Sequence, residues 1–158
     1  LLFTVRNGRP GADGKTYCEK IMMVGEDQET PMHFHWNKME DIINRGGGNL
    51  VLELYKADEE TEEFTDEPIV VSVDGITHTV EPGGQVILNP GESITLEPYV
   101  YHRFFGQTGK GRVLTGEVSA VNDDNTDNRF KEPLLRFPNL EEDKPPVHLL
   151  CSEYKDWL

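Results

Sequence analysis

The sequence predicts an all-β protein, a sandwich or small barrel built from short antiparallel strands. Glycine and proline punctuate the chain, with 15 and 10 copies among its 158 residues, and the segments between them are short and strand-like. No stretch before residue 137 shows a sustained apolar period of roughly 3.6 residues with helix caps. Many short strands separated by turns are typical of sandwiches and barrels, and this length fits one domain.

The expected strands follow one another with turn signals between them. We expect strands over residues 17–25, 49–57, 84–88, 93–105 and 111–121, and a hairpin over residues 68–81. In the second of these strands, Leu50, Leu52 and Leu54 alternate onto one face. The hairpin turns at Asp74-Gly75, a dipeptide that supplies the positive φ of a tight type I′ turn.

Two segments are expected to lie outside this framework. The acidic run 58–67 (DEETEEFTDE) is expected to be a solvated loop between two strands, with a partner-binding tail as the alternative. Residues 138–158 contain Pro145-Pro146 and an acidic run, and we expect them to form a peripheral tail of a single domain over residues 1–158. Because the chain begins with Leu1 rather than Met, we expect it to be part of a longer protein.

Composition limits the classes of partner. With 15 basic and 29 acidic residues the net charge is −14, which repels phosphate backbones, so nucleic acid is not an expected partner. No apolar run approaches the ~20 residues needed to span a bilayer, so a membrane is not expected either. Two cysteines, Cys18 and Cys151, are too few for a disulfide scaffold, which favours a reducing, cytoplasmic location.

Four residues could form a metal site. His33 and His35 are two apart, so both imidazoles point to one face of an extended strand, and a turn could bring Glu40 back to them. His102 shares the inward face of its strand with apolar residues, where a neutral imidazole needs a partner. Each histidine alone would also fit a hydrogen-bonded core position. Together the four residues favour a metal site.

These residues lie in motifs of a known family. The spacing His33-x-His35-x4-Glu40-x6-Gly47 resembles the first cupin motif, and Gly91, Pro98 and His102 resemble the second. Cupins hold three histidines and one glutamate around a divalent metal inside a small β-barrel or jelly roll. The resemblance therefore implies a single cupin domain with this ligand set, and by analogy with other cupins we expect a homodimer.

The resemblance extends to one cupin family in particular. The run TPMHFHWNKMEDIINRGGGNL and residues 116–124 (GEVSAVNDD) are similar to the cupin-type D-lyxose isomerases, and the likeness covers about Leu2 to Leu150. It implies an Mn(2+)-dependent aldose–ketose isomerase that interconverts D-lyxose and D-xylulose, and often D-mannose and D-fructose. Family members carry a further N-terminal, largely helical segment, which we expect this chain to lack.

Isomerisation needs a base for a carbon acid and groups that hold charge on oxygen. Lys38 lies between His35 and Glu40, so the ligand-bearing turn should hold its ammonium near the metal. Lys20 is in phase with inward residues of its strand, although an exposed, snorkelling lysine is the alternative. Glu117 also falls on an inward face, and we favour it as the carbon base, with a structural ion pair as the rival interpretation.

The loop 122–129 is rich in groups that could bind sugar hydroxyls. We expect Asp124, Asp127 and Arg129 to contact the substrate, with a solvated Asx-rich turn as the alternative. Trp36 and Tyr101 could stack on a sugar or pack between sheets or subunits, and the alternation of residues 93–105 places Tyr101 on the outward face.

The ligand set leaves alternatives open. Three imidazoles and one carboxylate fit Mn(2+), Fe(2+), Co(2+), Ni(2+) or Zn(2+), and a six-coordinate ion would keep two positions for adjacent sugar oxygens. A cupin oxygenase that uses Fe(2+) and a non-catalytic sugar-binding cupin are the competing functions. A phosphorylated sugar is the weaker choice of substrate, because a chain at −14 shows no evident arginine cluster.

Overall fold

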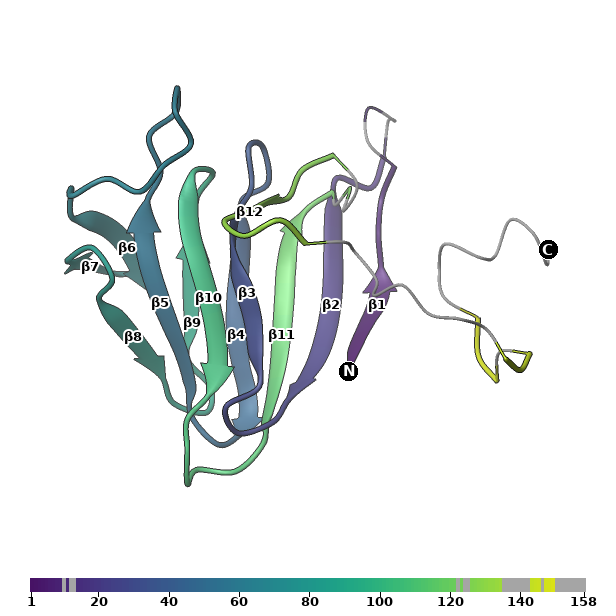
Figure 1. The fold of residues 1–158 in the computed structure, drawn as a ribbon. Helices are drawn as coiled ribbons and strands as arrows, with labels where there is room; N and C mark the ends of the chain where they lie inside the picture. The colour runs from purple at the N-terminus through teal and green to yellow at the C-terminus, as the bar shows by residue number, and fades with distance from the viewer. Residues whose placement is uncertain are drawn as a thin grey trace.

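The computed structural model of the protein describes residues 1–9, 11, 14–121, 123, 126–134, 143–145 and 147–149. Within these residues the chain forms twelve β-strands and no helix, so the all-β prediction is confirmed (Figure 1). The same residues contain no helix that is long and apolar enough to cross a bilayer. The strands are β1 Leu2–Arg6, β2 Tyr17–Val24, β3 Glu29–Phe34, β4 Glu40–Gly47, β5 Leu50–Lys56, β6 Ile69–Val73, β7 Ile76–Val80, β8 Gln85–Leu88, β9 Ser93–Leu96, β10 Val100–Gly106, β11 Val113–Ala120 and β12 Arg129–Phe130.

The strands form two sheets that face each other (Figure 1). One sheet has seven strands in the order β1-β2-β11-β4-β9-β6-β7, and the other has five in the order β12-β3-β10-β5-β8. Every pair of named strands is antiparallel. Because successive strands often lie in opposite sheets, strands far apart in the sequence become neighbours: β11 lies between β2 and β4, and β10 lies between β3 and β5.

The interior between the sheets changes from polar to apolar along the strands. On β2 the buried residues run from Lys20 to Met22 and Val24, and on β4 Glu40 is followed by Ile42. On β5 the leucines predicted to share a face are all fully buried in the apolar part. The apolar part supplies the hydrophobic core, and the polar part holds the titratable side chains described below.

The predicted hairpin is present. β6 pairs with β7 so that Val73 lies opposite Ile76, and Asp74 and Gly75 form the two-residue turn between them. Their φ angles are 48° and 80°, both in the left-handed region that a type I′ turn requires. The Asp-Gly dipeptide was thus sufficient to predict this turn from the sequence alone.

The prediction of a single strand over residues 93–105 is wrong. Residues 93–105 do not form one strand but two, β9 in the seven-stranded sheet and β10 in the five-stranded sheet. The chain turns at Glu97-Pro98-Tyr99, where Pro98 has no N–H to continue a ladder and Tyr99 adopts a φ of 60°. Tyr101 still lies on the outer face of its strand, but it is fully buried there, in a second apolar cluster with Phe34.

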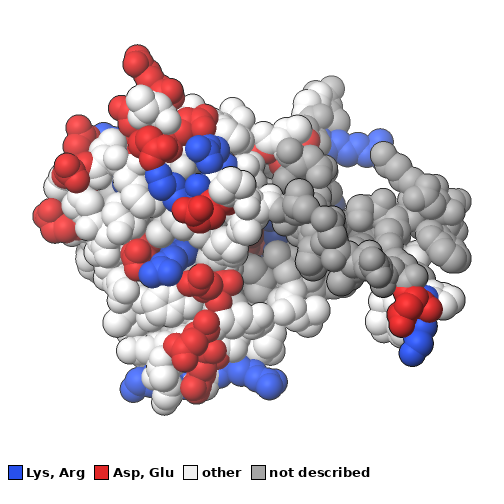
Figure 2. Space-filling model, viewed as in Figure 1, with Lys and Arg blue, Asp and Glu red and all other residues white. Residues whose placement is uncertain are grey.

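The acidic run 58–67 connects β5 to β6 as a loop, as predicted. Its acidic side chains crowd one end of the molecule in the space-filling view (Figure 2). Phe64 departs from the solvated pattern, because its ring stacks on Tyr55 at a centroid distance of 4.1 Å. Part of the loop therefore covers the outer face of the five-stranded sheet, which accounts for the burial of Tyr101.

Gly47, the last residue of the first motif, occupies a position where a side chain has no room. Its φ is 93°, and a Cβ built there would lie 2.2 Å from the carbonyl oxygen of Arg112. We expect Gly47→Ala to lower the free energy of unfolding by more than ~2 kcal/mol, because left-handed strain adds to overpacking.

The matched control is Gly109→Ala, at a φ of 74° with open space around the new methyl group. It should lose only the strain, ~1–2 kcal/mol. Denaturant unfolding of both variants measures the difference, and equal losses would show that the close approach of Arg112 does not matter.

Candidate metal centre

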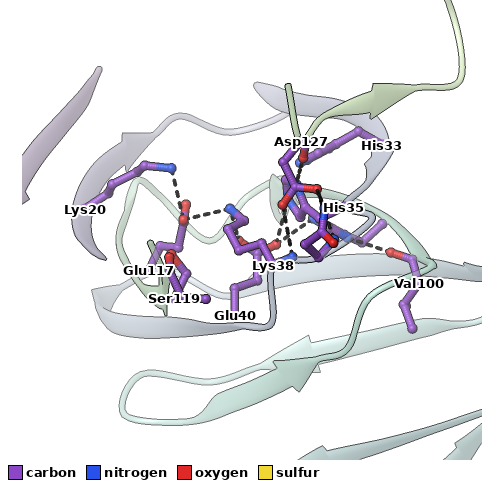
Figure 3. Close-up of polar contacts among 12 residues, drawn as sticks. Lys20, His33, His35, Lys38, Glu40, Val100, Glu117, Ser119 and Asp127 are labelled. Carbon is purple, nitrogen blue, oxygen red and sulfur yellow. Dashed lines mark hydrogen bonds and ion pairs between the residues drawn. The ribbon is translucent and has the colours of Figure 1, made fainter. Parts of the chain in front are cut away.

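The four sequence-predicted ligands meet between the two sheets. His33 lies near the end of β3, and His102 is its register partner on β10. His35 follows β3 by one residue, and Glu40 begins β4 in the facing sheet. Their candidate ligand atoms all lie within 4.8 Å of one another, and all four side chains are buried. Figure 3 shows three of these residues converging from their separate elements.

Each of the three imidazoles is oriented through Nδ1 by a backbone carbonyl. A carbonyl only accepts hydrogen bonds, so each Nδ1 carries the proton and each Nε2 keeps its lone pair in the neutral ring. This is the tautomer in which Nε2 can bind a metal. The carbonyl oxygens and their distances from Nδ1 are Pro31 at 2.7 Å for His33, Asp127 at 2.6 Å for His35 and Val100 at 2.9 Å for His102.

The atoms that face the centre of the cluster lack hydrogen bonds. Nε2 of His35 and Nε2 of His102 lie 3.4 Å and 2.9 Å from Oε1 of Glu40, yet none of these three buried atoms has a hydrogen-bond partner. Buried polar atoms left without a partner are costly and uncommon. Two imidazole lone pairs beside a carboxylate oxygen fit a bound cation, so this cluster could hold a divalent metal ion.

The charge states of two members suit such an ion. Burial, followed by the neighbouring imidazoles of His102 and His35, holds the pKa of His33 well below its usual range. Burial alone would raise the pKa of Glu40, but the Lys38 ammonium and the nearby imidazoles hold it well below its usual range. At neutral pH His33 is therefore uncharged and Glu40 is ionised, which are the forms that bind metals.

A row of alternating charges extends from the cluster into the seven-stranded sheet (Figure 3). Nζ of Lys38 lies 2.7 Å from Oε2 of Glu40 and 2.9 Å from Oε1 of Glu117. The same Oε1 of Glu117 lies 3.0 Å from Nζ of Lys20, its register partner on β2. All four side chains are buried, so the inward positions predicted for Lys20 and Glu117 are confirmed and a snorkelling Lys20 is excluded.

Lys38 is held as a cation. Burial alone would lower its pKa, but the carboxylates of Glu40 and Glu117 outweigh burial and raise the pKa above the usual range. The ammonium therefore persists across the physiological pH range and can donate hydrogen bonds or balance negative charge. It is not suited to remove a proton from carbon.

The loop expected to bind sugar has partners within the protein. Asp127 accepts hydrogen bonds from the backbone N–H groups of Asn37 and Lys38. Nε of Arg129 donates to Oε2 of Glu62 at 2.7 Å. Contact of Asp127 and Arg129 with a sugar stays a prediction, and Asp124 lies outside the described residues.

Glu62 is a residue that sequence reasoning missed. Its carboxylate accepts hydrogen bonds from Trp36 at 3.0 Å and from Arg129, and its backbone carbonyl accepts one from the Tyr101 hydroxyl. The bonds from Arg129 and Trp36 lower the pKa of Glu62. Tyr101 is fully buried and Trp36 partly buried in one apolar cluster, which lies on the outer face of the five-stranded sheet rather than between the sheets. Nothing in the acidic run distinguishes Glu62 from its acidic neighbours in the sequence.

A cavity of about 280 Å³ lies beside this site. Its lining includes Asn37, Lys38 and Asp127 of the site together with Lys15 and Thr16 of the β1–β2 connection. None of the four candidate ligands lines it, so the cavity reaches the charge row at Lys38 rather than the metal cluster itself.

Fold and site together define a cupin whose interior could hold a metal ion. Solved structures support the fold assignment. The L-ribose isomerase of Cellulomonas parahominis with no ligand matches with a TM-score of 0.60 and 18% identity, over 82% of this chain and 68% of that one. The Acinetobacter sp. DL28 L-ribose isomerase in complex with L-ribose matches with a TM-score of 0.57 and 17% identity, over 82% and 69%. The predicted cupin fold is confirmed.

Sequence comparison identifies the family. The family model described as D-lyxose isomerase matches residues 1–154. The D-lyxose/D-mannose isomerase of Serratia proteamaculans is 56% identical over 155 residues, which cover 97% of this chain and 68% of the relative. That of Escherichia coli O157:H7 is 52% identical over 160 residues, which cover 99% and 69%. The chain belongs to the D-lyxose isomerase family, and the prediction of an aldose–ketose isomerase is confirmed.

Replacing any one of the four candidate ligands with Ala should remove most of the bound divalent metal. The variants should still fold, because the core between the sheets is largely apolar. His78→Ala is the matched control, since His78 is exposed on β7. Elemental analysis of the purified proteins gives the metal content, and full occupancy in His102→Ala would show that the third imidazole is misplaced.

The depressed pKa of His33 predicts how the metal-free protein responds to acid. Below pH ~6.5 the unfolded chain protonates this imidazole, whereas the folded protein resists protonation. The unfolded state then binds more protons, so stability falls as the pH falls, by at most ~1.4 kcal/mol per pH unit for this group. His33→Gln should flatten that slope in denaturant titrations between pH 6.5 and 5.5, and His78→Gln should not. An unchanged slope in His33→Gln would contradict the lowered pKa of His33.

Proposed function

We propose that this isomerase interconverts D-lyxose and D-xylulose, and also D-mannose and D-fructose, at an Mn(2+) ion held by His33, His35, Glu40 and His102. The substrates follow the names of the relatives, both called D-lyxose/D-mannose isomerase. The observation that carries the proposal is the buried charge row of Lys38 and Glu117, which adjoins the proposed ligand Glu40.

The proposed ligand set fits a divalent ion by its chemistry. Imidazole nitrogens and a carboxylate oxygen suit several first-row metals, and membership of this family favours Mn(2+). When bound, the ion would act as a Lewis acid toward the sugar carbonyl and fix two adjacent sugar oxygens. The rest of the chemistry falls to side chains of this chain.

Glu117 is the proposed carbon base. Its two ion pairs both involve Oε1, which leaves Oε2 outside them. In the aldose-to-ketose direction, Glu117 would accept the proton from C2 and return it to C1. The electron pair of the broken C–H bond forms a C1–C2 double bond, and negative charge develops on O1. Once a proton has passed from O2 to O1, return of the proton taken from C2 to C1 leaves the carbonyl at C2.

Lys38 and Lys20 support this transfer as cations. Lys38, held as an ammonium between two carboxylates, can stabilise the charge that develops on oxygen and pass a proton from O2 to O1. Lys20 contacts Oε1 of Glu117 from the neighbouring strand and holds that carboxylate in position. Each contact lies in the buried interior, where electrostatic interactions are weakly screened.

The substrate panel is the direct test of the function. The protein loaded with Mn(2+) should convert D-lyxose and D-mannose to ketoses faster than other aldoses, and faster than aldose phosphates. The same metal in the His102→Ala preparation should give little or no ketose. Consumption of O2 with the substrate would instead indicate an oxygenase, and binding without turnover would indicate a sugar-binding cupin.

Glu117→Gln separates catalysis from structure. The amide keeps the shape but cannot accept the C2 proton, so ketose formation should slow by the ~10²–10⁴ typical of one acid–base group. Exchange of the substrate C–H hydrogen with deuterated solvent should slow in parallel, while metal content and sugar affinity survive.

Glu53→Gln is the matched control, because Glu53 is a partly buried carboxylate paired with Arg103 at 2.8 Å in the other sheet. It should retain wild-type turnover. Wild-type turnover in Glu117→Gln with a lowered melting temperature would identify Glu117 as a structural ion-pair partner and remove it from the mechanism.

A further inference from the structure

Asp127 connects two segments that lie far apart in the sequence. It precedes β12, and it contacts the connection between β3 and β4 that carries His35 and Lys38. Every hydrogen bond between Asp127 and this connection has Asp127 as the acceptor. In the close-up Asp127 lies directly beside His35 and Lys38 (Figure 3).

The carboxylate of Asp127 fixes the backbone of that connection. Oδ1 accepts from the backbone N–H of Asn37 at 3.0 Å and from Nδ2 of Asn37 at 3.2 Å. Oδ2 accepts from the backbone N–H of Lys38 at 3.0 Å. Both oxygens are thus used on two successive residues, which restrains the turn between the proposed ligands His35 and Glu40.

The backbone carbonyl of Asp127 orients one of the proposed ligands. His33 and His102 each donate Nδ1–H to the carbonyl two residues earlier on their own strand. His35 instead donates to the carbonyl of Asp127, 92 positions away, at 2.6 Å. Among the three imidazoles, His35 is therefore the one whose orientation depends on a distant segment of the chain.

The segment that carries Asp127 is itself anchored on both sides. The N–H of Asp127 donates to the carbonyl of Asp123 at 3.0 Å. Beyond it, Arg129 of β12 pairs with Phe34 of β3 and donates to Glu62, and the ring of Phe130 lies 5.4 Å from the ring of His33. The Asp127 segment is thus held by contacts beyond those that it makes with His35, Asn37 and Lys38.

We propose that Asp127 is a positioning residue that sets the orientation of the His35 imidazole and the placement of the Lys38 ammonium. This role rests on the proposed metal centre and is an alternative to the sugar contact expected for Asp127 from the sequence. Because both side chains depend on one residue, disturbing Asp127 should weaken metal binding and catalysis together. A sugar ligand would instead affect substrate affinity alone.

The test measures metal binding without any sugar, so its outcome is separate from that of the isomerase assay. Asp127→Ala keeps the backbone carbonyl but removes the carboxylate that fixes this residue beside the β3–β4 connection. It should therefore weaken Mn(2+) binding by about 10- to 100-fold in competition with a chelator, the loss typical of residues that orient metal ligands. It should also alter the visible absorption of the Co(2+)-substituted protein. Asp127→Asn keeps one acceptor oxygen and should show a smaller change in the same direction, and it carries the test if the Ala variant does not fold.

Glu26→Ala is the matched control. Its carboxylate also accepts two backbone N–H groups of a distant loop, those of Gly109 and Gly111, but at the opposite end of the strands (Figure 1). It should bind Mn(2+) with wild-type affinity even if its melting temperature falls. Wild-type Mn(2+) affinity and an unchanged Co(2+) spectrum in both Asp127 variants would overturn the proposal. So would a raised KM for the sugar with metal affinity unaltered, because that pattern identifies a substrate contact.

Discussion

The carboxylate of Glu40 is the group on which the arrangement of the site depends. One of its oxygens faces the imidazoles of His35 and His102, and the other pairs with Lys38 at 2.7 Å. Buried charges are tolerated only when they are paired, and removing one partner of a buried pair costs ~3–5 kcal/mol. Lys20, Glu117, Lys38 and Glu40 alternate in sign, so the row is electrically balanced. The imidazoles and any bound cation are arranged around Glu40, the last member of this row.

The two-sheet architecture makes this junction possible. The three imidazoles come from β3, the residue that follows it and β10, whereas Glu40, Glu117 and Lys20 come from β4, β11 and β2 in the opposite sheet. Antiparallel register places Glu117 opposite Lys20 and His102 opposite His33. The separations of Glu117 from Lys20 and of His102 from His33 are thus set by hydrogen-bonded ladders. Loops contribute Lys38 and His35, and these are the two side chains that Asp127 restrains.

The features of the fold and the site that could be predicted from the sequence are those with a local sequence pattern. Alternation identified the buried face of β5, Asp74-Gly75 identified a turn, and the spacing from His33 to Glu40 indicated three of the four candidate ligands. Features that depend on contacts between residues far apart in the sequence could not be predicted. Pro98 ends a strand and sends the chain to the other sheet, although the apolar alternation continues across it. β1 was not predicted, because all its residues are exposed and carry no burial pattern. The contacts of Glu62 and Asp127 join segments that no local signal connects.

If Glu40 joins a metal site to the buried charge row, anomalous diffraction at the manganese edge should reveal the junction in crystals of the full chain grown with Mn(2+). We expect one interior peak within coordination distance of Nε2 of the three histidines and of Oε1 of Glu40, with Lys38 still paired to Oε2. A peak at another position, or an ion bound by the histidines while Glu40 turns away toward Lys38 alone, would contradict that expectation.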